Sequence, residues 1–402
     1  MTEQCIVIIT GHYPPPFTAN AIRAYYMARS LRKQGFDVIV IPLLSSWCGS
    51  RIGEFNEKII SPFVSVKSEL KRPSVLQRLQ DFIIKQKKRS KLLSVLRDHN
   101  PSTIIATLPP VEAIPIAFYI AKRLKIPLIT DVQDLADDYR IMERPYLYPL
   151  IRYYFKKVYK AISEAELVLA TTEFMAEELR KRIRNNNIIV VHNGVDIKRY
   201  TKCFEIRQSF KTQEPIAVFL GDLNWKYHKL ESFIKALNLL HDEGIKVRLK
   251  VIGTGKLLPK LQKLTKKLRL ENQVKFFGYL EFNKLIREMG TSSFAVAGRP
   301  AINNKWIKTS IRLTIYEYLA CGLPILAYGP PNSYTQHFIE ESKTGIYIQS
   351  DNEVNIAKGV LKLLQLAKKA TDINYRCKQV ALTYEWNTIM EKWAIFIKDV
   401  AN

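Results

Sequence analysis

The chain has 402 residues, about twice the size of a typical domain, so two compact domains with sizeable cores are expected. Hydrophobic residues make up 47% of it and charged residues 25%, which is close to globular averages and excludes a disordered, collagen-like or membrane-embedded class for the bulk of the chain. A count of 62 Lys and Arg against 37 Asp and Glu gives a net charge of +25. This excess calls for an anionic partner: nucleic acid, an anionic lipid surface or a phosphorylated substrate.

Cysteine usage and the N-terminus favour a cytoplasmic protein. The five cysteines are scattered, with no CxxC pair and no histidine at zinc-ligand spacing, so neither a metal site nor a disulfide framework is expected. The first residues, MTEQCIVIIT, lack the basic and apolar regions of a signal peptide. Three prolines and a glutamate interrupt the most apolar long window, 104–121, and no transmembrane helix is expected.

Short apolar runs alternate with amphipathic stretches along the first half of the chain. This alternation is typical of a parallel sheet covered on both faces, because each crossover helix returns the chain to the same end of the sheet. The predicted strands are Cys5–Thr10, Asp37–Leu44, Ser102–Thr107, Pro127–Val132, Leu167–Thr172 and Ile188–His192.

The polar stretch Lys198–Glu214 interrupts this rhythm and predicts a boundary between a first domain, 1–200, and a second, 201–384. A last amphipathic pattern, at about 385–402, could close the second domain or pack back on the first. The predicted fold is α/β, with two Rossmann-like, doubly wound parallel sheets facing across a cleft in which ligands bind. The second set of strands is predicted at Pro215–Gly221, Val247–Gly253, Gln273–Gly278, Ser292–Gly298 and Leu323–Tyr328.

Two glycines mark a turn in the second domain. Gly253 and Gly255 end a predicted strand and open a helix, where the backbone must turn tightly and can approach a ligand closely. A strand-to-helix turn without any ligand would have the same pattern, and both interpretations stay open.

A second segment, TSIRLTIYEYLACGLP (309–324), carries an anion-binding signal. Thr309 or Ser310 can N-cap a helix that runs through Ala320, and the free N–H groups at its start favour a diphosphate. Glu317 lies roughly 12 Å further along such a helix, where its carboxylate could accept from ribose hydroxyls.

Five segments together resemble the retaining glycosyltransferases of family 4, which have the two-domain B-type fold. The resemblance implies that the second domain binds a UDP- or GDP-linked sugar and the first binds a saccharide or lipid-linked acceptor. It also implies that transfer retains the anomeric configuration without a metal ion or another cofactor. The segments are HYPPPFTANAIRAYYMARSLRKQGFDVIVI from residue 12, VVHNGVD at 190–196, VIGTG at 251–255, VKFFGYL at 274–280 and YEYLACGLPIL at 316–326.

Carried over residue by residue, the resemblance gives Glu317 the role of the acid on the ribose. Thr309 stands where the family has an acid that touches the transferred sugar, and Asp222 follows Gly221 where an arginine is frequent. Another cation must therefore neutralise the leaving diphosphate. The candidates, with the first two favoured, are Lys229, Arg312, Lys226, Arg299, Lys305 and Lys308.

In the first domain, three prolines stiffen the loop before Asn20, and Asn20 can cap the helix that follows. The resemblance places this loop against the acceptor and the donor phosphate. His12 in the loop and Asp134, paired with Asp131 at another strand end, are candidate catalytic groups. A structural role for His12 and a turn-capping role for the aspartates are the alternatives.

Asn193 and Gly194 close the last strand of the first domain and form a hinge-like interdomain segment. We expect no Ser-His-Asp triad, no covalent nucleophile and no Walker-type loop. Catalysis would then rest on orienting the acceptor hydroxyl and stabilising the departing diphosphate, which could itself take the acceptor's proton.

Two basic clusters, Lys85–Arg97 and Arg144–Lys160, lie in the acceptor half. Cations interleaved with aromatic and apolar side chains favour an anionic membrane surface, although a solvated helix face has a similar pattern. No motif for base readout is present, so specific nucleic-acid binding is not expected. The membrane interpretation places the protein peripherally on the inner face of the cytoplasmic membrane.

The sequence therefore predicts a glycosyltransferase in the assembly of a surface polysaccharide or glycolipid. Because of Thr309 and Asp222, a catalytically silent relative that acts as a binding or scaffold subunit stays open as an alternative. A nucleotide-sugar epimerase or a sugar phosphorylase of the same fold is a further alternative, which would act without an acceptor or with orthophosphate, respectively.

Overall fold

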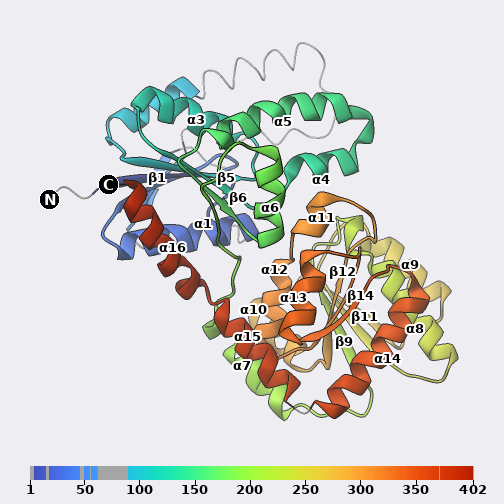
Figure 1. Cartoon of the computed structure of the whole chain (residues 1–402). Coiled ribbons are helices and arrows are strands. Elements are labelled where there is room, and N and C mark those ends of the chain that lie inside the picture. The colour runs from blue at the N-terminus through green and yellow to red at the C-terminus, as the bar shows by residue number, and fades with distance from the viewer. Residues whose placement is uncertain are drawn as a thin grey trace. The chain divides into compact units, whose positions relative to one another are not determined.

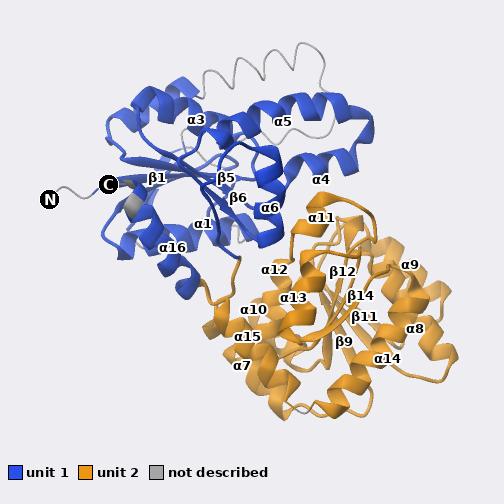
Figure 2. Cartoon of the chain, in the orientation of Figure 1, with its two compact units in different colours: residues 1–192, 387–402 blue, residues 193–386 orange. Residues whose placement is uncertain are grey.

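The chain forms two units, drawn in different colours in Figure 2. Unit 1 combines Met1–His192 with Asn387–Asn402, and unit 2 is Asn193–Trp386. Each unit has a central, mainly parallel sheet with helices on both faces (Figure 1), as the α/β prediction required. The computed structural model describes residues 4–14, 18–45, 49–54, 56–61, 89–370 and 372–401.

Unit 1 has an eight-stranded sheet in the order β3-β4-β2-β1-β5-β6-β7-β8. The strands pair in parallel, except that β3 pairs antiparallel with β4. Every residue of β1 and β5 is buried, because helices cover both faces of the sheet. The strands are β1 (Cys5–Thr10), β2 (Asp37–Pro42), β3 (Gly49–Ile52), β4 (Lys58–Ser61), β5 (Thr103–Leu108), β6 (Leu128–Val132), β7 (Leu167–Ala170) and β8 (Ile188–Val190).

In unit 1, α1 (Ala19–Lys33) and α16 (Trp386–Ala401) lie on one face of the sheet, and α3 (Ala113–Leu124) and α5 (Tyr148–Ser163) lie on the other (Figure 1). The Ser30 hydroxyl of α1 donates to the Met390 carbonyl at 2.8 Å. Of the two positions that the sequence left open for its last helix, α16 therefore takes the one on unit 1. Further helical segments are residues 89–97, α4 (Ala136–Glu143), η1 (Pro145–Leu147) and α6 (Glu173–Arg182).

Unit 2 has a six-stranded parallel sheet in the order β11-β10-β9-β12-β13-β14. Helices α8, α9 and α14 cover one face, and α10, α12 and α13 cover the other (Figure 1). Its strands are β9 (Ile216–Leu220), β10 (Arg248–Ile252), β11 (Val274–Gly278), β12 (Phe294–Gly298), β13 (Ile325–Tyr328) and β14 (Gly345–Ile348). Its helices are α7 (Ile197–Ser209), η2 (Lys226–His228), α8 (Leu230–Asp242), α9 (Leu258–Lys267), α10 (Phe282–Gly290), α11 (Lys305–Thr309), α12 (Leu313–Ala320), α13 (Tyr334–Ser342), α14 (Glu353–Lys369) and α15 (Ile373–Thr383).

The boundary between the units lies at His192/Asn193, eight residues before the predicted one at 200/201. The polar stretch Lys198–Glu214, which predicted the boundary, forms most of α7, whose N-terminus is capped by the Asp196 carboxylate. The polar face of this helix interrupts the apolar pattern in the sequence, whereas its buried residues, such as Tyr200, pack into unit 2.

A disulfide joins Cys203 of α7 to Cys321, the residue after α12, with their Cα atoms 5.1 Å apart. The expectation that no cysteines pair was wrong. These two are 118 residues apart in sequence, and only the packing of α7 against α12 brings them together. Cys5 and Cys377 are free and buried.

Candidate functional site

Each sheet has one point at which the strand order reverses: between β1 and β5 in unit 1, and between β9 and β12 in unit 2. Ligands of doubly wound sheets bind beside the carboxyl ends of the strands at such a point. A ligand is therefore expected beside the residues that follow these four strands.

Asn20 is the centre of the polar contacts at this point in unit 1. Its Oδ1 accepts hydrogen bonds from the Thr10 hydroxyl and from the N–H groups of Gly11 and His12, at 2.9, 3.2 and 3.3 Å. Its Nδ2 donates to the Thr107 hydroxyl at 3.2 Å and, at 3.0 Å, to the carbonyl of the residue after β5. The prediction that Asn20 caps the helix was wrong: it lies within α1 and instead ties the end of β1 to the end of β5.

Thr18 is the residue that caps α1, since its hydroxyl accepts from the Ala21 N–H at 3.2 Å. The contacts of Asn20 also bear on the loop that the resemblance places against the donor phosphate. Because the N–H groups of Gly11 and His12 donate to Asn20, these two amides are already engaged within the unit. His12 is half-buried, and burial lowers the pKa of its imidazole below the usual value. A neutral imidazole can accept a proton, so its catalytic role remains a prediction.

Asp131 is fully buried and forms a two-pronged ion pair with Arg23 of α1. Arg23 Nη2 and Nε donate to the two carboxylate oxygens at 2.7 and 2.9 Å, and Gln133 donates to the same carboxylate at 2.8 Å. The interpretation of Asp131 and Asp134 as a pair of catalytic carboxylates is therefore wrong for Asp131, which is held in a structural ion pair. Asp134 is half-buried in the turn before α4, where its carbonyl accepts from Ala136 N–H at 3.0 Å, and its catalytic role remains a prediction.

Asn193 and Gly194 lie between β8 and α7, where the chain enters unit 2. The next residue, Val195, donates to the Tyr384 carbonyl at 2.9 Å and accepts from the Trp386 N–H at 3.2 Å. The segment that enters unit 2 and the segment that leaves it are therefore hydrogen-bonded to each other. This pairing agrees with a hinge-like segment, and a contact of Asn193 or Gly194 with the acceptor remains a prediction.

In unit 2, the glycines that the sequence singled out pack two loops against each other. Gly253 and Gly255 have φ values of +140° and +152°. A Cβ atom on Gly253 would lie 1.9 Å from the Gly221 carbonyl oxygen, and one on Gly255 would lie 2.3 Å from the backbone of Leu223. Close packing of the loops after β9 and β10 is thus sufficient to require glycine at both positions, and their contact with a ligand remains a prediction.

Arg312 lies beside this junction and is 7% exposed. Its Nη2 donates to the Leu220 carbonyl at 2.8 Å, and its guanidinium lies 5.1 Å from the centre of the Phe219 ring. Its Nη1 is buried and has no hydrogen-bond partner among the residues that the structure describes. A buried guanidinium nitrogen with an unused N–H is a strong donor for an anionic ligand.

Arg299 adds a second cation to this region, and a neutral histidine, His228, lies beside both arginines. Arg299 follows β12 and lies over the rings of Tyr227 and Trp306, at 4.9 and 4.8 Å. His228 is buried, and burial together with Arg312 and Arg299 lowers the pKa of its imidazole far below the usual value. The imidazole is therefore neutral at physiological pH beside two guanidinium groups, an arrangement that suits a diphosphate.

The helix predicted from Thr309 or Ser310 through Ala320 begins only at Leu313, as α12, and a separate helix, α11, ends at Thr309. Neither predicted cap has that role, because the Thr309 hydroxyl donates to the Lys305 carbonyl at 2.9 Å and the Ser310 hydroxyl to the Trp306 carbonyl at 2.7 Å. Both hydroxyls bond back to the preceding turn, as such residues do at the end of a helix. Direct binding of the donor by Thr309 and Ser310 remains a prediction.

Lys229, one of the two favoured cations, pairs with Asp351 at 3.0 Å. Asp222, which replaces a frequent arginine, accepts from the N–H and the side-chain amide of Asn224 at 2.9 and 2.8 Å. Of the favoured cations, Arg312 therefore has the stronger structural case. A phosphate contact by Lys229 would have to compete with Asp351.

Glu317 is half-buried on α12, and the hydroxyl of Tyr200 on α7 hydrogen-bonds to its carboxylate. Burial raises the pKa of Glu317 above the usual value, against the lowering effect of Tyr200, Arg199 and Arg312. Sequence reasoning missed Tyr200, His228 and Arg23. Each is a common residue type without a distinctive local spacing, and only the fold brings it to a candidate group.

The basic clusters are arranged differently from one another. Of Lys85–Arg97, residues 85–88 lie outside the described ones, and Leu92, Leu93 and Leu96 of the helix at 89–97 are buried in unit 1 and cannot meet a lipid. In Arg144–Lys160, by contrast, several aromatic and aliphatic side chains are exposed. No helix within the described ranges combines the length and the apolar character needed to cross a bilayer.

Two family models match successive halves of the chain. The model described as Glycosyltransferase Family 4 matches residues 21–199, and the model described as Glycosyl transferases group 1 matches residues 203–380. The two matches follow each other almost without a gap, close to the boundary between the units.

The chain is also similar to the GDP-mannose-dependent alpha-(1-6)-phosphatidylinositol dimannoside mannosyltransferase of Mycobacterium tuberculosis, at 30% identity over 164 residues. That match spans 40% of this chain and 40% of the mannosyltransferase. Two solved structures share the fold over nearly their whole length. Sucrose-phosphate synthase from Thermosynechococcus elongatus has a TM-score of 0.77 at 13% identity and 99% coverage of both chains. Anabaena HepE in complex with UDP and glucose has a TM-score of 0.70 at 15% identity, covering 98% of this chain and 99% of that one.

Proposed function

Because the chain belongs to the family 4 glycosyltransferases, which have the two-domain B-type fold, we propose that it transfers a sugar from a UDP- or GDP-linked donor to a saccharide or lipid-linked acceptor. Unit 2 binds the donor, and unit 1 binds the acceptor. Transfer retains the anomeric configuration and needs no metal ion. The reaction takes place on the inner face of the cytoplasmic membrane, in the synthesis of a cell-surface polysaccharide or glycolipid.

The observation that carries this proposal is the buried guanidinium of Arg312 at the switch point of unit 2, whose Nη1 has no partner among the described residues. A departing diphosphate would supply the missing acceptor oxygens and would be stabilised by Arg312 and Arg299. Its own oxygen would take the proton of the acceptor hydroxyl, with the two reactants held in place by the protein. Glu317 would accept from the ribose hydroxyls.

The names of similar proteins fit such a donor and such an acceptor. The mycobacterial mannosyltransferase depends on GDP-mannose and acts on a phosphatidylinositol dimannoside, and HepE was crystallised with UDP and glucose. The proposed reaction is therefore hexosyl or N-acetylhexosaminyl transfer from a UDP- or GDP-linked donor.

The test is incubation of the purified protein with UDP-, GDP- and dTDP-sugars, each with and without EDTA. We expect one donor to raise the melting temperature and to be hydrolysed slowly without acceptor, equally in the presence of EDTA. With an acceptor, the product should keep the anomeric configuration of the donor sugar, as read from its NMR coupling constants. A dependence on divalent metal, or inversion of configuration, would contradict the mechanism.

A second candidate is a catalytically silent donor-binding subunit. The observations that favour it are Thr309 at the position of a family acid, with its hydroxyl engaged by the Lys305 carbonyl, and Asp222 at the position of a frequent arginine. This alternative predicts a thermal shift with a donor but no turnover of that donor with any acceptor.

A further inference from the structure

A groove of about 960 Å³ runs along α5 of unit 1 and reaches the end of α6. The proposed donor chemistry uses none of its residues. The rings of Phe155 and Tyr159 form part of its lining. Six cationic side chains also line it: Arg152, Lys156, Lys157, Lys160, Arg182 and Arg184.

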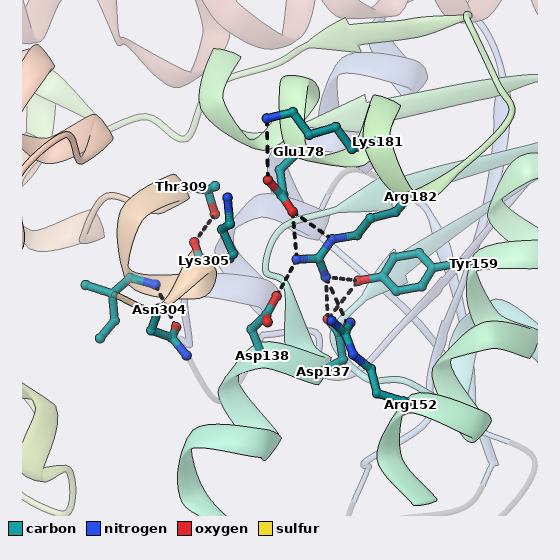
Figure 3. Close-up of polar contacts among 11 residues, drawn as sticks. Asp137, Asp138, Arg152, Tyr159, Glu178, Lys181, Arg182, Asn304, Lys305 and Thr309 are labelled. Carbon is teal, nitrogen blue, oxygen red and sulfur yellow. Dashed lines mark hydrogen bonds and ion pairs between the residues drawn. The ribbon is translucent and has the colours of Figure 1, made fainter. Parts of the chain in front are cut away.

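Two of these cations are neutralised within unit 1 (Figure 3). The buried Asp137 carboxylate binds Arg152 at 2.8 Å and Arg182 at 2.9 Å, and it accepts from the Tyr159 hydroxyl at 2.7 Å. Arg182 also binds Glu178 at 3.0 Å. This network joins α5 to α4 and α6, so the walls of the groove are held in a fixed arrangement.

The other four cations remain uncompensated. Lys156, Lys157, Lys160 and Arg184 are exposed, and none forms an ion pair with an acidic residue in the part of the chain that the structure describes. Glu164, the acidic residue of the lining, is paired with Lys122 at 2.9 Å. The groove therefore carries a local excess of positive charge that an anionic ligand would neutralise.

Exposed apolar side chains continue from the cationic part of α5 towards its N-terminus. Tyr146, Tyr148, Leu150 and Tyr153 are 76%, 50%, 59% and 63% exposed. Apolar groups thus occupy one end of this segment and free cations its middle. This is how an interfacial helix meets a bilayer, with apolar side chains among the acyl chains and cations at the phosphates. Binding of a nucleic acid would not explain the exposed aliphatic side chain of Leu150. A lipid is therefore the better match.

We propose that the α5 groove is a binding site for the phosphate headgroup of an anionic membrane lipid, with Lys156, Lys157, Lys160 and Arg184 around the phosphate and residues 146–153 in the bilayer. The site deepens the proposed function, on which it rests for its membrane setting. The sequence predicted contact of Arg144–Lys160 with an anionic membrane, and the groove adds a defined site for the lipid headgroup within that stretch. Arg152 and Arg182 act indirectly, since they hold the groove in shape.

The test compares two triple variants with the same change in charge. Lys156→Gln/Lys157→Gln/Lys160→Gln removes three cations from the groove, and Lys260→Gln/Lys263→Gln/Lys267→Gln removes three exposed cations from α9 of unit 2. Co-sedimentation uses vesicles of phosphatidylcholine alone and of an equal mixture of phosphatidylcholine and phosphatidylglycerol. We expect the groove variant to lose about 10- to 100-fold in affinity for the anionic vesicles, and the α9 variant to lose less than about 2-fold.

Several outcomes would overturn the site. These are equal losses in both variants, no preference of the wild type for anionic vesicles, or displacement from vesicles by millimolar glycerol 3-phosphate, which would indicate a site for free phosphate. A loss of single-stranded RNA binding without a loss of vesicle binding would instead indicate a nucleic-acid surface. A second variant, Leu150→Ser/Tyr153→Ser, should weaken vesicle binding and keep all cations in place.

The thermal shift with a nucleotide-sugar separates this test from that of the proposed function. We expect the same shift in the wild type and in both triple variants. A donor shift without vesicle binding would overturn the groove alone, and vesicle binding without any donor shift would overturn the proposed function alone.

Discussion

The switch points of the two sheets differ in how far their polar groups satisfy one another. In unit 1, Asn20 and the Arg23–Asp131 pair link the ends of β1, β5 and β6 through short hydrogen bonds. In unit 2, the corresponding place holds Arg312 with a buried nitrogen that lacks a partner among the described residues, beside Arg299.

This difference shows how two sheets of the same type can have different roles. A buried polar group without a partner costs free energy, so a protein keeps one where a ligand completes it. A network that is already complete gains rigidity instead, and it offers fewer groups to a ligand. We therefore expect unit 2 to bind an anion at its switch point, whereas the polar groups at the strand ends of unit 1 hold a loop in place.

The largest effect should come from Asp131→Ala, which would leave Arg23 charged and buried. We expect the free energy of unfolding to fall by about 3–5 kcal/mol in denaturant titrations. The matched control is Asp37→Ala, because the Asp37 side chain is 47% exposed and pairs with Arg32 at 3.1 Å, so its loss should cost under about 1 kcal/mol. Similar losses in both variants would show that the buried pair has no special structural weight.

An intermediate effect should follow from Arg312→Ala, which removes the unsatisfied donor. Donor-nucleotide affinity, measured by isothermal titration calorimetry, should fall by about 2–3 kcal/mol, or about 30- to 150-fold, because a charge-assisted hydrogen bond is lost. Arg287→Ala, on the exposed surface of α10, changes the same residue type and should leave the affinity unchanged. An unaltered affinity in Arg312→Ala would show that the unsatisfied donor in unit 2 does not bind the nucleotide.

The smallest effect concerns Glu317, whose pKa is raised mainly by burial. Folding therefore favours its protonated form, and stability is lost as the pH rises from the ordinary carboxyl pKa through the raised value. If the ionised carboxylate accepts from ribose, nucleotide affinity should decrease as the pH falls through that raised pKa. Glu317→Gln should lose about 1–1.5 kcal/mol of affinity at neutral pH and show no such decrease.

Calorimetry at several mildly acidic to neutral pH values would follow this decrease in the wild type. The exposed Glu340→Gln serves as the control and should keep the wild-type profile. If nucleotide affinity has the same pH dependence in the wild type and in Glu317→Gln, the Glu317 carboxylate does not bind the ribose.

The main strands were predictable because their residues are buried on both faces and form continuous apolar runs, as in β1 and β13. The prediction missed β3, β4 and β14, which have four residues each. Every residue of β3 is exposed, and the apolar run of β14, in the sequence GIYI, is short and only partly buried. Their pairing partners, rather than their own residues, define them as strands.

The contacts within the candidate site could not be predicted from the sequence. Spacing and residue type selected Asn20, Thr309 and Arg312 as candidate ligand-binding residues. They could not reveal that Asn20 spans two strand ends, or that the Thr309 hydroxyl bonds to the turn before it. Such contacts depend on which chain segments the fold brings together. From the local sequence alone, several hydrogen-bond partners are equally suitable for a polar side chain.

Unit 2 is an insertion within unit 1, since α16 completes unit 1 only after residues 193–386. The segments that enter and leave unit 2 are hydrogen-bonded to each other at Val195. During synthesis, the whole of unit 2 leaves the ribosome before the last helix of unit 1 exists. Unit 2 can therefore fold before unit 1 is complete, and unit 1 is completed only when α16 docks on α1. A segment whose ends are already hydrogen-bonded to each other is also well suited to separate expression or to circular permutation.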